Sequence, residues 1–200
     1  MIPTLPLAVR NRLAETILAA FHETSARGEL AALAVATPAT VPAGWLAHDE
    51  SSHADALLER ARRAHAAIAA GPSLRPDQSV AEAMAAAAAL FDAGLYFEVH
   101  EVLEPHWVRA EGADRDALQG LIQIAVGFQH LANGNLAGAR SLLAEGGFRL
   151  ERSPRAGLDA REFARGVRSA LARLPAVGTV PPFPRRSEGA GAAPSSSRDT

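Results

Sequence analysis

The sequence predicts an all-α protein: a compact helical bundle built around an antiparallel helical hairpin, with a helical N-terminal extension and a disordered C-terminal tail. Alanine and leucine dominate the apolar residues, and aromatic residues make up only 5% of the chain. This composition favours closely packed helices over a twisted sheet. Apolar residues also recur at helical spacing in several segments, and glycine, proline and small polar residues separate these segments.

The N-terminal extension, residues 1–75, is predicted to contain helices and one irregular connection. Residues 7–35 read as helix, with apolar residues on one stripe, and Gly28 is a candidate point of division. Prolines and small polar residues mark 37–52 as a connection. A further helix is expected at about 53–70, because a Gly-Pro pair follows it directly.

The main unit is predicted to begin with two helices joined by a tight turn. Asp77 or Ser79 can cap a helix over 81–93, because short polar side chains accept hydrogen bonds from the first free N–H groups. Gly94 suits the left-handed conformation that ends such a helix. A second helix is expected at about 96–110.

Three more helices are predicted after a short turn at 111–113. Asp114 can cap the first of them, which ends at the Asn-Gly-Asn turn of 133–135. The second is expected at about 136–145, and the third at 159–174, where apolar residues again form a stripe.

The domain organisation predicted from these elements is an extension at 1–75, a core domain at 76–175 and a tail at 176–200. The tail is rich in Pro, Gly, Ser and Arg and has little to bury, so we expect it to be disordered. No run approaches about 18 apolar residues, and prolines and charges interrupt the N-terminus. We therefore expect no membrane partner and a cytoplasmic location.

Charge and residue usage exclude several kinds of chemistry. The net charge is -2 and the basic residues form no stripe, so we expect no nucleic-acid partner. The chain lacks Lys and Cys, which removes Schiff-base and thiolate catalysis and leaves only His, carboxylates and amides to bind a metal. A homo-oligomer or a protein partner stays open.

Polar residues gather on the predicted helix 96–110. At about 100° per residue, His100, Glu104 and Trp107 fall within about 60° of one another, on the stripe that should face the core. Glu98 and Glu101 lie on its flank. The next helix repeats this pattern on one face, with Gln119, Gln123 and His130. If the hairpin folds about Gly112, Glu104 lies near Gln119 and His100 near Gln123, which predicts a buried polar cluster.

This cluster has two interpretations from the residues alone. His100 and Glu104 can ligate a divalent ion, but they supply only two ligands, so Glu101 or a residue outside the hairpin must complete the shell. His130 lies about 9 Å away along the helix axis at 1.5 Å per residue, too far to share the ion. Pro105 can bend the helix. Alternatively, the residues hydrogen-bond one another and only tie two helices together.

Fixed spacings in this region match a family pattern in three groups of positions. They are Phe91, Gly94, Tyr96, Phe97, Glu98, His100, Glu101, Leu103, Glu104 and Trp107; Gln119 to Gln123, Ala125, Val126 and His130; and Gly134, Asn135, Gly138 and Ala139. The chain here resembles the bacterial and archaeal domain of unknown function 309, over about 81–150. The resemblance implies a compact helical domain, in a family labelled on motif grounds as predicted metal-dependent hydrolases.

Two functions are therefore expected. In a metal-dependent hydrolase, His100 and Glu104 would ligate a divalent ion, Glu98 or Glu101 would act as general base, and Gln119 and Gln123 would orient the substrate. In a non-catalytic scaffold or protein-interaction module, the polar cluster that also includes His130, Trp107 and Tyr96 would be structural.

Overall fold

The computed structural model describes residues 5–71, 75, 77–152, 160–175 and 180–185. In these residues the chain forms eight α-helices, two short 3-10 helices and no strand, which confirms the all-α prediction. The elements are α1 (Leu7–Ala19), α2 (Thr24–Val35), η1 (Pro38–Thr40), η2 (His48–His53), α3 (Ala54–Ala70), α4 (Val80–Asp92), α5 (Tyr96–Arg109), α6 (Gly112–Ala132), α7 (Leu136–Arg152) and α8 (Ala160–Ala172).

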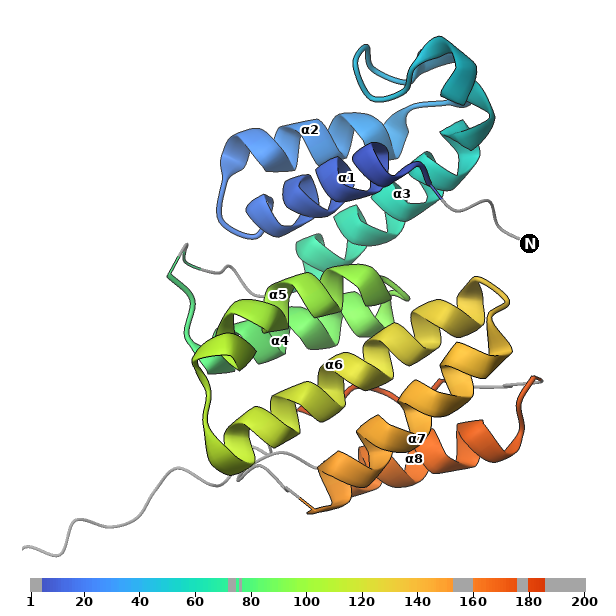
Figure 1. The fold of residues 1–200 in the computed structure, drawn as a ribbon. Helices are drawn as coiled ribbons and strands as arrows, with labels where there is room; N and C mark the ends of the chain where they lie inside the picture. Colours follow the sequence, from blue (N-terminus) through green and yellow to red (C-terminus); the bar gives the residue numbers. More distant parts are fainter. Residues whose placement is uncertain (1–4, 72–74, 76, 153–159, 176–179, 186–200) are drawn as a thin grey trace, which may run out of the picture.

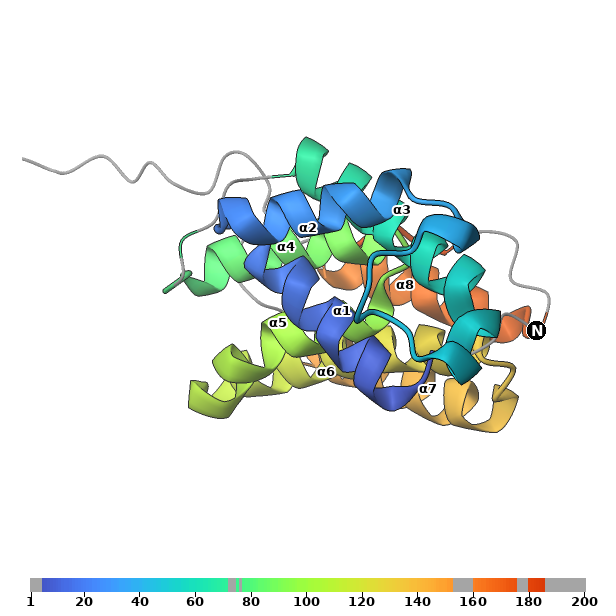
Figure 2. The same cartoon turned by 90° about the horizontal axis from the view of Figure 1, so that it is seen from above.

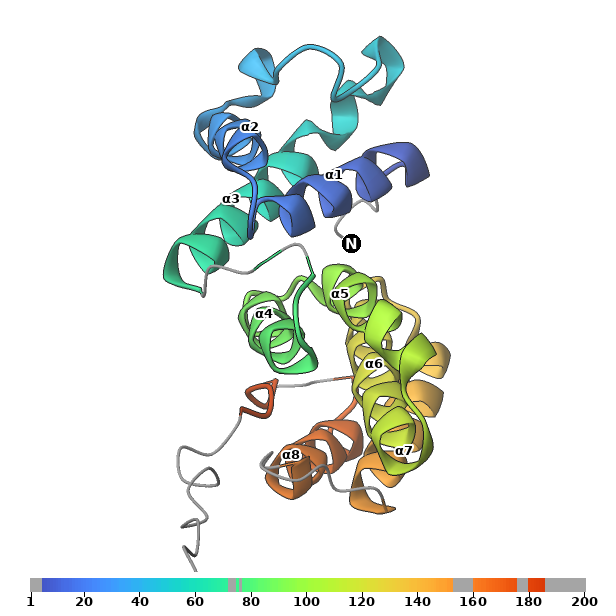
Figure 3. The same ribbon diagram turned by 90° about the vertical axis from the view of Figure 1, so that its left-hand side faces the viewer.

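The helices are stacked in successive layers along the chain. Helices α1 to α3 lie on one side of the molecule and α4 to α8 on the other, and α4 and α5 form the layer next to α1 and α3 (Figure 1, Figure 3). Seen from above, α1 crosses over the layer that contains α5 (Figure 2). A single apolar cluster includes Leu57 of α3 and Phe91 of α4, so the two groups share one core. The division at residue 75 remains a prediction.

The predicted hairpin is formed by α5 and α6, which are joined by two residues and pack against each other. On its other side α6 packs closely on α7, because glycines lie where the two helices cross. A Cβ atom on Gly146 would stand 2.6 Å from the carbonyl oxygen of Gly120, so the two helices would have to shift apart to accept it. The hairpin is thus held between the N-terminal layer and α7. No helix in the described residues is both long and apolar enough to cross a membrane.

Local signals around α4 are confirmed. The Ser79 hydroxyl accepts a hydrogen bond from the Glu82 N–H (3.3 Å), and the Glu82 carboxylate accepts one from the Ser79 N–H (2.7 Å). This reciprocal cap satisfies two of the free N–H groups at the helix start. Gly94 follows α4 with φ +72°, the left-handed conformation expected at that position.

Three helix boundaries differ from the predictions. Helix α6 begins at Gly112 with Glu111 at the N-cap position, so Asp114 lies in its first turn and not at the cap. The segment 7–35 divides before α2 rather than at Gly28, because Arg27 donates hydrogen bonds to the carbonyl oxygens of Ala20 and Phe21 and so satisfies the end of α1. Helix α7 continues to Arg152 rather than ending near 145. Its interior glycines lower helix propensity, but their close packing on α6 outweighs that cost.

Part of the segment expected to be a disordered tail is packed on the core. Phe183 is only 2% exposed and lies against Phe91 and Phe163, with ring centroids 5.2 Å and 5.5 Å away. Asp92 accepts a hydrogen bond from the Phe183 N–H (3.0 Å) and pairs with Arg185. One buried aromatic ring and one carboxylate therefore order residues 180–185. Residues 176–179 and 186–200 lie outside the described part of the chain.

Candidate metal centre

Helix α5 divides its residues between the core and a partly open flank. Val99, Val102 and Leu103 are buried against the core, which fixes the rotation of the helix about its axis. His100, Glu101 and Glu104 consequently lie on the flank, and their side chains are 29%, 34% and 47% exposed. The prediction that His100 and Glu104 face the interior of the hairpin is therefore wrong. They lie at its edge, because the β-branched and leucine side chains fill the interior.

The three side chains nevertheless come together. His100 Nδ1 lies 2.9 Å from Glu101 Oε1, and His100 Nε2 lies 3.9 Å from Glu104 Oε1. One nitrogen and two carboxylate oxygens can be chosen that all lie within 4.8 Å of one another. Protein ligands stand about 2.0–2.2 Å from a zinc ion. Each of the three residues offers one such ligand atom, so the chemistry and the proximity of the set fit a divalent ion.

Pro105 lies inside α5 without ending it. A proline has no N–H, so the helix cannot form its usual hydrogen bond to the carbonyl group four residues earlier, that of Glu101. The freed carbonyl therefore belongs to one of the three clustered residues. This is the local irregularity expected from the sequence, located beside the cluster.

Glu98 has a different environment, although it is only two residues from His100. Its side chain is 0% exposed, and both of its oxygens accept hydrogen bonds from Arg60 Nη2, at 3.0 Å and 3.1 Å. Arg60 lies on α3 and is itself 16% exposed. The pair joins the N-terminal layer to α5. Sequence reasoning missed it, because Arg60 lies 38 residues away and carries no motif.

The two glutamines and His130 do not join the cluster. Gln123 donates a hydrogen bond to Glu145 of α7 (3.0 Å) and not to His100, which corrects the predicted pairing across the hairpin. Gln119 is half-buried on α6. His130 Nδ1 accepts a hydrogen bond from the Asn135 side-chain amide (2.9 Å), within the turn that follows α6. The polar face of α6 is directed to α7 and its own turn, because α7 packs there.

Trp107 packs against an arginine, whereas Tyr96 packs against aromatic rings. The Arg115 guanidinium stands over the Trp107 ring at 4.5 Å, and among the described residues the buried Trp107 Nε1 has no hydrogen-bond partner. Tyr96 stacks on Phe128 with ring centroids 5.6 Å apart. Burial raises the pKa of the Tyr96 phenol above its ordinary value, so the phenol stays neutral.

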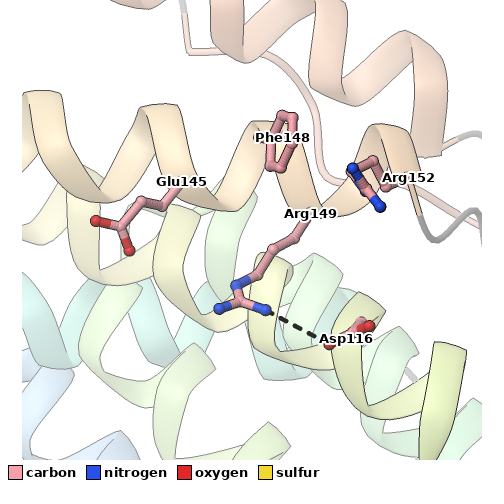
Figure 4. Close-up of a pocket in the computed structure, with 5 residues that line it drawn as sticks. All are labelled: Asp116, Glu145, Phe148, Arg149 and Arg152. Carbon is pink, nitrogen blue, oxygen red and sulfur yellow. Dashed lines mark hydrogen bonds and ion pairs between the residues drawn. The ribbon is translucent and has the colours of Figure 1, made fainter.

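A separate surface hollow lies between α6 and α7, with a volume of about 210 Å³ (Figure 4). Arg149 points across it to Asp116, with Nη1 to Oδ1 at 3.4 Å (Figure 4). Glu145, the partner of Gln123, lies at its edge. Phe148 is 58% exposed there. The hollow is remote from His100 in sequence and holds no second group of metal ligands among the described residues.

Comparison with known proteins supports the resemblance seen in the sequence. Residues 84–142 match the model of a family described as Domain of unknown function (DUF309). This match over 59 of the 200 residues supports membership of that family for the matched segment. The match runs from α4 to the first turns of α7 and includes the whole candidate metal centre, whereas Arg60 lies outside it. The description of DUF309 names no activity. No curated protein and no solved structure matches the chain.

Proposed function

We propose that this DUF309 domain binds a divalent metal ion through His100, Glu101 and Glu104. The observation that carries the proposal is the convergence of one imidazole nitrogen and two carboxylate oxygens within 4.8 Å. Imidazole and carboxylate together suit zinc, manganese and iron rather than the soft metals that thiolates select. The three side chains are between 29% and 47% exposed, so an ion can reach them from solvent.

The hydrolase prediction is a finer step of the same proposal. Three protein ligands leave a tetrahedral ion one open position, and a divalent ion there lowers the pKa of a bound water and polarises a substrate carbonyl or phosphoryl group. Because Glu101 serves as a metal ligand in this proposal, another residue must act as the general base. Glu98 is a poor candidate, since both of its oxygens hold Arg60 and its side chain is 0% exposed.

The alternative is a scaffold in which the polar residues only tie helices together. Two contacts favour it: Glu98 pairs with Arg60 across α3 and α5, and Gln123 bonds Glu145 across α6 and α7. The cluster itself differs from these ties, because His100, Glu101 and Glu104 all lie on one helix. Contacts between partly exposed groups of one helix contribute little to tertiary stability. Metal binding therefore explains the cluster better than a structural role.

The test is a titration of zinc into protein purified without an affinity tag, with the heat of binding measured by calorimetry. We expect one ion per chain for the wild type, and a loss of binding of about tenfold or more in His100→Gln and in Glu104→Gln. Glu15→Gln, an exposed carboxylate on α1, is the matched control and should bind as the wild type does. Absence of zinc and manganese binding in the wild type would refute the proposal. Release of nitrophenol from nitrophenyl phosphate or acetate, dependent on the ion, tests the hydrolase step.

A further inference from the structure

We propose that the chain has a second ligand site, a cleft between the N-terminal layer and the hairpin that binds a small aromatic anion. The cleft has a volume of about 310 Å³ and is lined by residues of α1, α3, the start of α5 and the end of α6. In the ribbon, α1 and α3 lie on one side and α5 and α6 on the other (Figure 1, Figure 3). The cleft is lined by Arg10, Arg60, Arg63, Tyr96, Phe97 and Gln129, among others. None of these residues belongs to the candidate metal centre.

Each of the three arginines is anchored by one part of its guanidinium group. Arg60 Nη2 holds Glu98 at 3.0 Å, and Arg63 Nη1 donates to the carbonyl oxygen of Ala93 at 3.2 Å. The Arg10 guanidinium lies 4.3 Å from the centre of the Phe97 ring. These contacts fix the side chains in place before any ligand arrives, which reduces the entropy that a ligand would have to overcome.

The same arginines retain donors that make no hydrogen bond, although Arg63 Nε lies 4.0 Å from Glu59 Oε1, a long ion pair. The Nε atoms of Arg10, Arg60 and Arg63 are buried and have no hydrogen-bond partner in the described part of the chain. A buried donor without an acceptor is unfavourable, and three in one cleft are uncommon. An oxyanion in the cleft would supply acceptors for the guanidinium groups that line it. Arginine is suited to this, because its planar fork matches carboxylate and phosphate oxygens.

The charge balance of the cleft favours an anion. Three guanidinium groups face two carboxylates, Glu59 at the rim and Glu98 beneath Arg60. The cleft is therefore positive although the whole chain has a net charge of -2. The sequence gives no sign of this, because the basic residues are scattered along it and only folding brings α1 and α3 together. Low-dielectric walls strengthen the attraction of such a site for an anion.

The rest of the lining identifies the body of the ligand. Phe97 and Tyr96 present aromatic side chains, and Leu5, Ala56 and Ala132 add apolar surface. Ligand sites with a few polar groups on an apolar lining bind molecules that have a polar head and an apolar body. The volume of about 310 Å³ admits a single small ring. The chemistry that fits is an aromatic carboxylate or an aromatic phosphate ester.

The experiment measures binding of benzoate, phenyl phosphate and the neutral benzamide to the full chain by calorimetry. We expect one of the two anions to bind with a millimolar or tighter dissociation constant, and benzamide not to bind. Which anion binds distinguishes a carboxylate from a phosphate ligand. Failure of both anions, or equal binding of benzamide, would overturn the proposal.

Variants locate the site. Arg10→Gln and Arg63→Gln should each weaken binding of that anion about ten- to a hundredfold, the effect of losing a charge-assisted hydrogen bond. Arg165→Gln, an exposed arginine on α8, should leave it unchanged. Arg60 is avoided because it also pairs with Glu98. Circular dichroism checks folding, and if Arg63→Gln unfolds, Arg10→Gln decides. Unchanged affinity in Arg10→Gln contradicts the assignment. Zinc binding at His100 is measured separately and does not affect either outcome.

Discussion

The two ends of the acidic stretch on α5 differ sharply although they are close in sequence. Glu98 is fully buried and ion-paired with Arg60 of another helix. Glu101 and Glu104 are partly exposed, and both lie close to His100 of the same helix. The first carboxylate is part of the structural connection between two layers, whereas the other two are available to a ligand.

The difference shows that burial, rather than residue type, separates a structural carboxylate from a ligand-binding one. Removing one partner of a buried ion pair leaves an uncompensated charge in a low-dielectric environment. Removing a partly exposed carboxylate leaves its neighbours to water. Replacing Glu98 by Gln should therefore lower stability and leave metal binding unchanged. Replacing Glu101 or Glu104 by Gln should weaken metal binding and leave stability nearly unchanged.

The largest effect is expected for Glu98→Gln. The change leaves Arg60 without its counter-charge, and we expect the free energy of unfolding to fall by about 3–5 kcal/mol, as for other broken buried pairs. Urea denaturation followed by circular dichroism measures it. The double variant Arg60→Met with Glu98→Leu should recover most of the loss, since no charge is then left unpaired. A single variant as stable as the wild type would remove the contrast between the two ends of α5.

The comparison also depends on how α6 holds α5 in position. Gly146→Ala puts a methyl group into the crossing of α6 and α7, 2.6 Å from the Gly120 carbonyl oxygen. We expect a loss of about 1–3 kcal/mol from overpacking, despite the better helix propensity of alanine. The matched control is Gly28→Ala on α2, where nothing lies within 4 Å. That variant should gain about 0.5–1 kcal/mol in the same denaturation experiment. Equal changes in the free energy of unfolding for the two variants would show that α6 and α7 are not closely packed where they cross.

A smaller effect is expected for His100→Gln. Its contacts with Glu101 and Glu104 join partly exposed groups of one helix, so unfolding in metal-free buffer should change by less than about 1 kcal/mol. A loss comparable to that of Glu98→Gln would instead favour the scaffold interpretation of the cluster.

The smallest effect is expected at Glu82, whose carboxylate is 29% exposed and nevertheless has a structural role as part of a helix cap. The Ser79 N–H and hydroxyl, with Arg75, lower the pKa of Glu82 from 4.5 to about 2. A carboxylate with a lowered pKa stabilises the folded state above its unfolded pKa and loses that contribution as the pH falls through the folded one. The stability difference between wild type and Glu82→Gln should therefore shrink between pH 4.5 and pH 2. A difference independent of pH would contradict the cap.

The sequence predicted what depends on neighbours in the chain. The all-α fold, the hairpin, the Ser79 cap and the turn at Gly94 follow from local periodicity and capping. Spacing on one helix also brought His100 and Glu104 together correctly, and Glu101 joins them. Each of these features involves residues at most a few turns apart, where helix geometry alone fixes the distance.

What the sequence did not predict depends on packing between distant segments. The hairpin prediction assumed that the polar faces of α5 and α6 contact each other. Instead, α7 packs on the face of α6 that carries Gln123, and Gln123 donates a hydrogen bond to Glu145. Arg60 pairs with Glu98, which lies 38 residues away in the sequence, and Phe183 is buried in the core although its segment was expected to be disordered. No local pattern encodes such pairings. A single buried aromatic ring or a single buried charged group is enough to determine which distant segments pack together.

The most direct measurement compares zinc-induced shifts of the melting temperature in the wild type, Glu98→Gln and Glu104→Gln. An ion that binds only the folded state raises Tm, and at a given ion concentration the rise grows with the logarithm of the affinity. We predict that Glu98→Gln lowers the Tm of the metal-free protein and keeps the zinc shift, whereas Glu104→Gln keeps the metal-free Tm and loses the shift. A zinc shift that survives in Glu104→Gln, or disappears in a folded Glu98→Gln, would contradict the division of roles along α5.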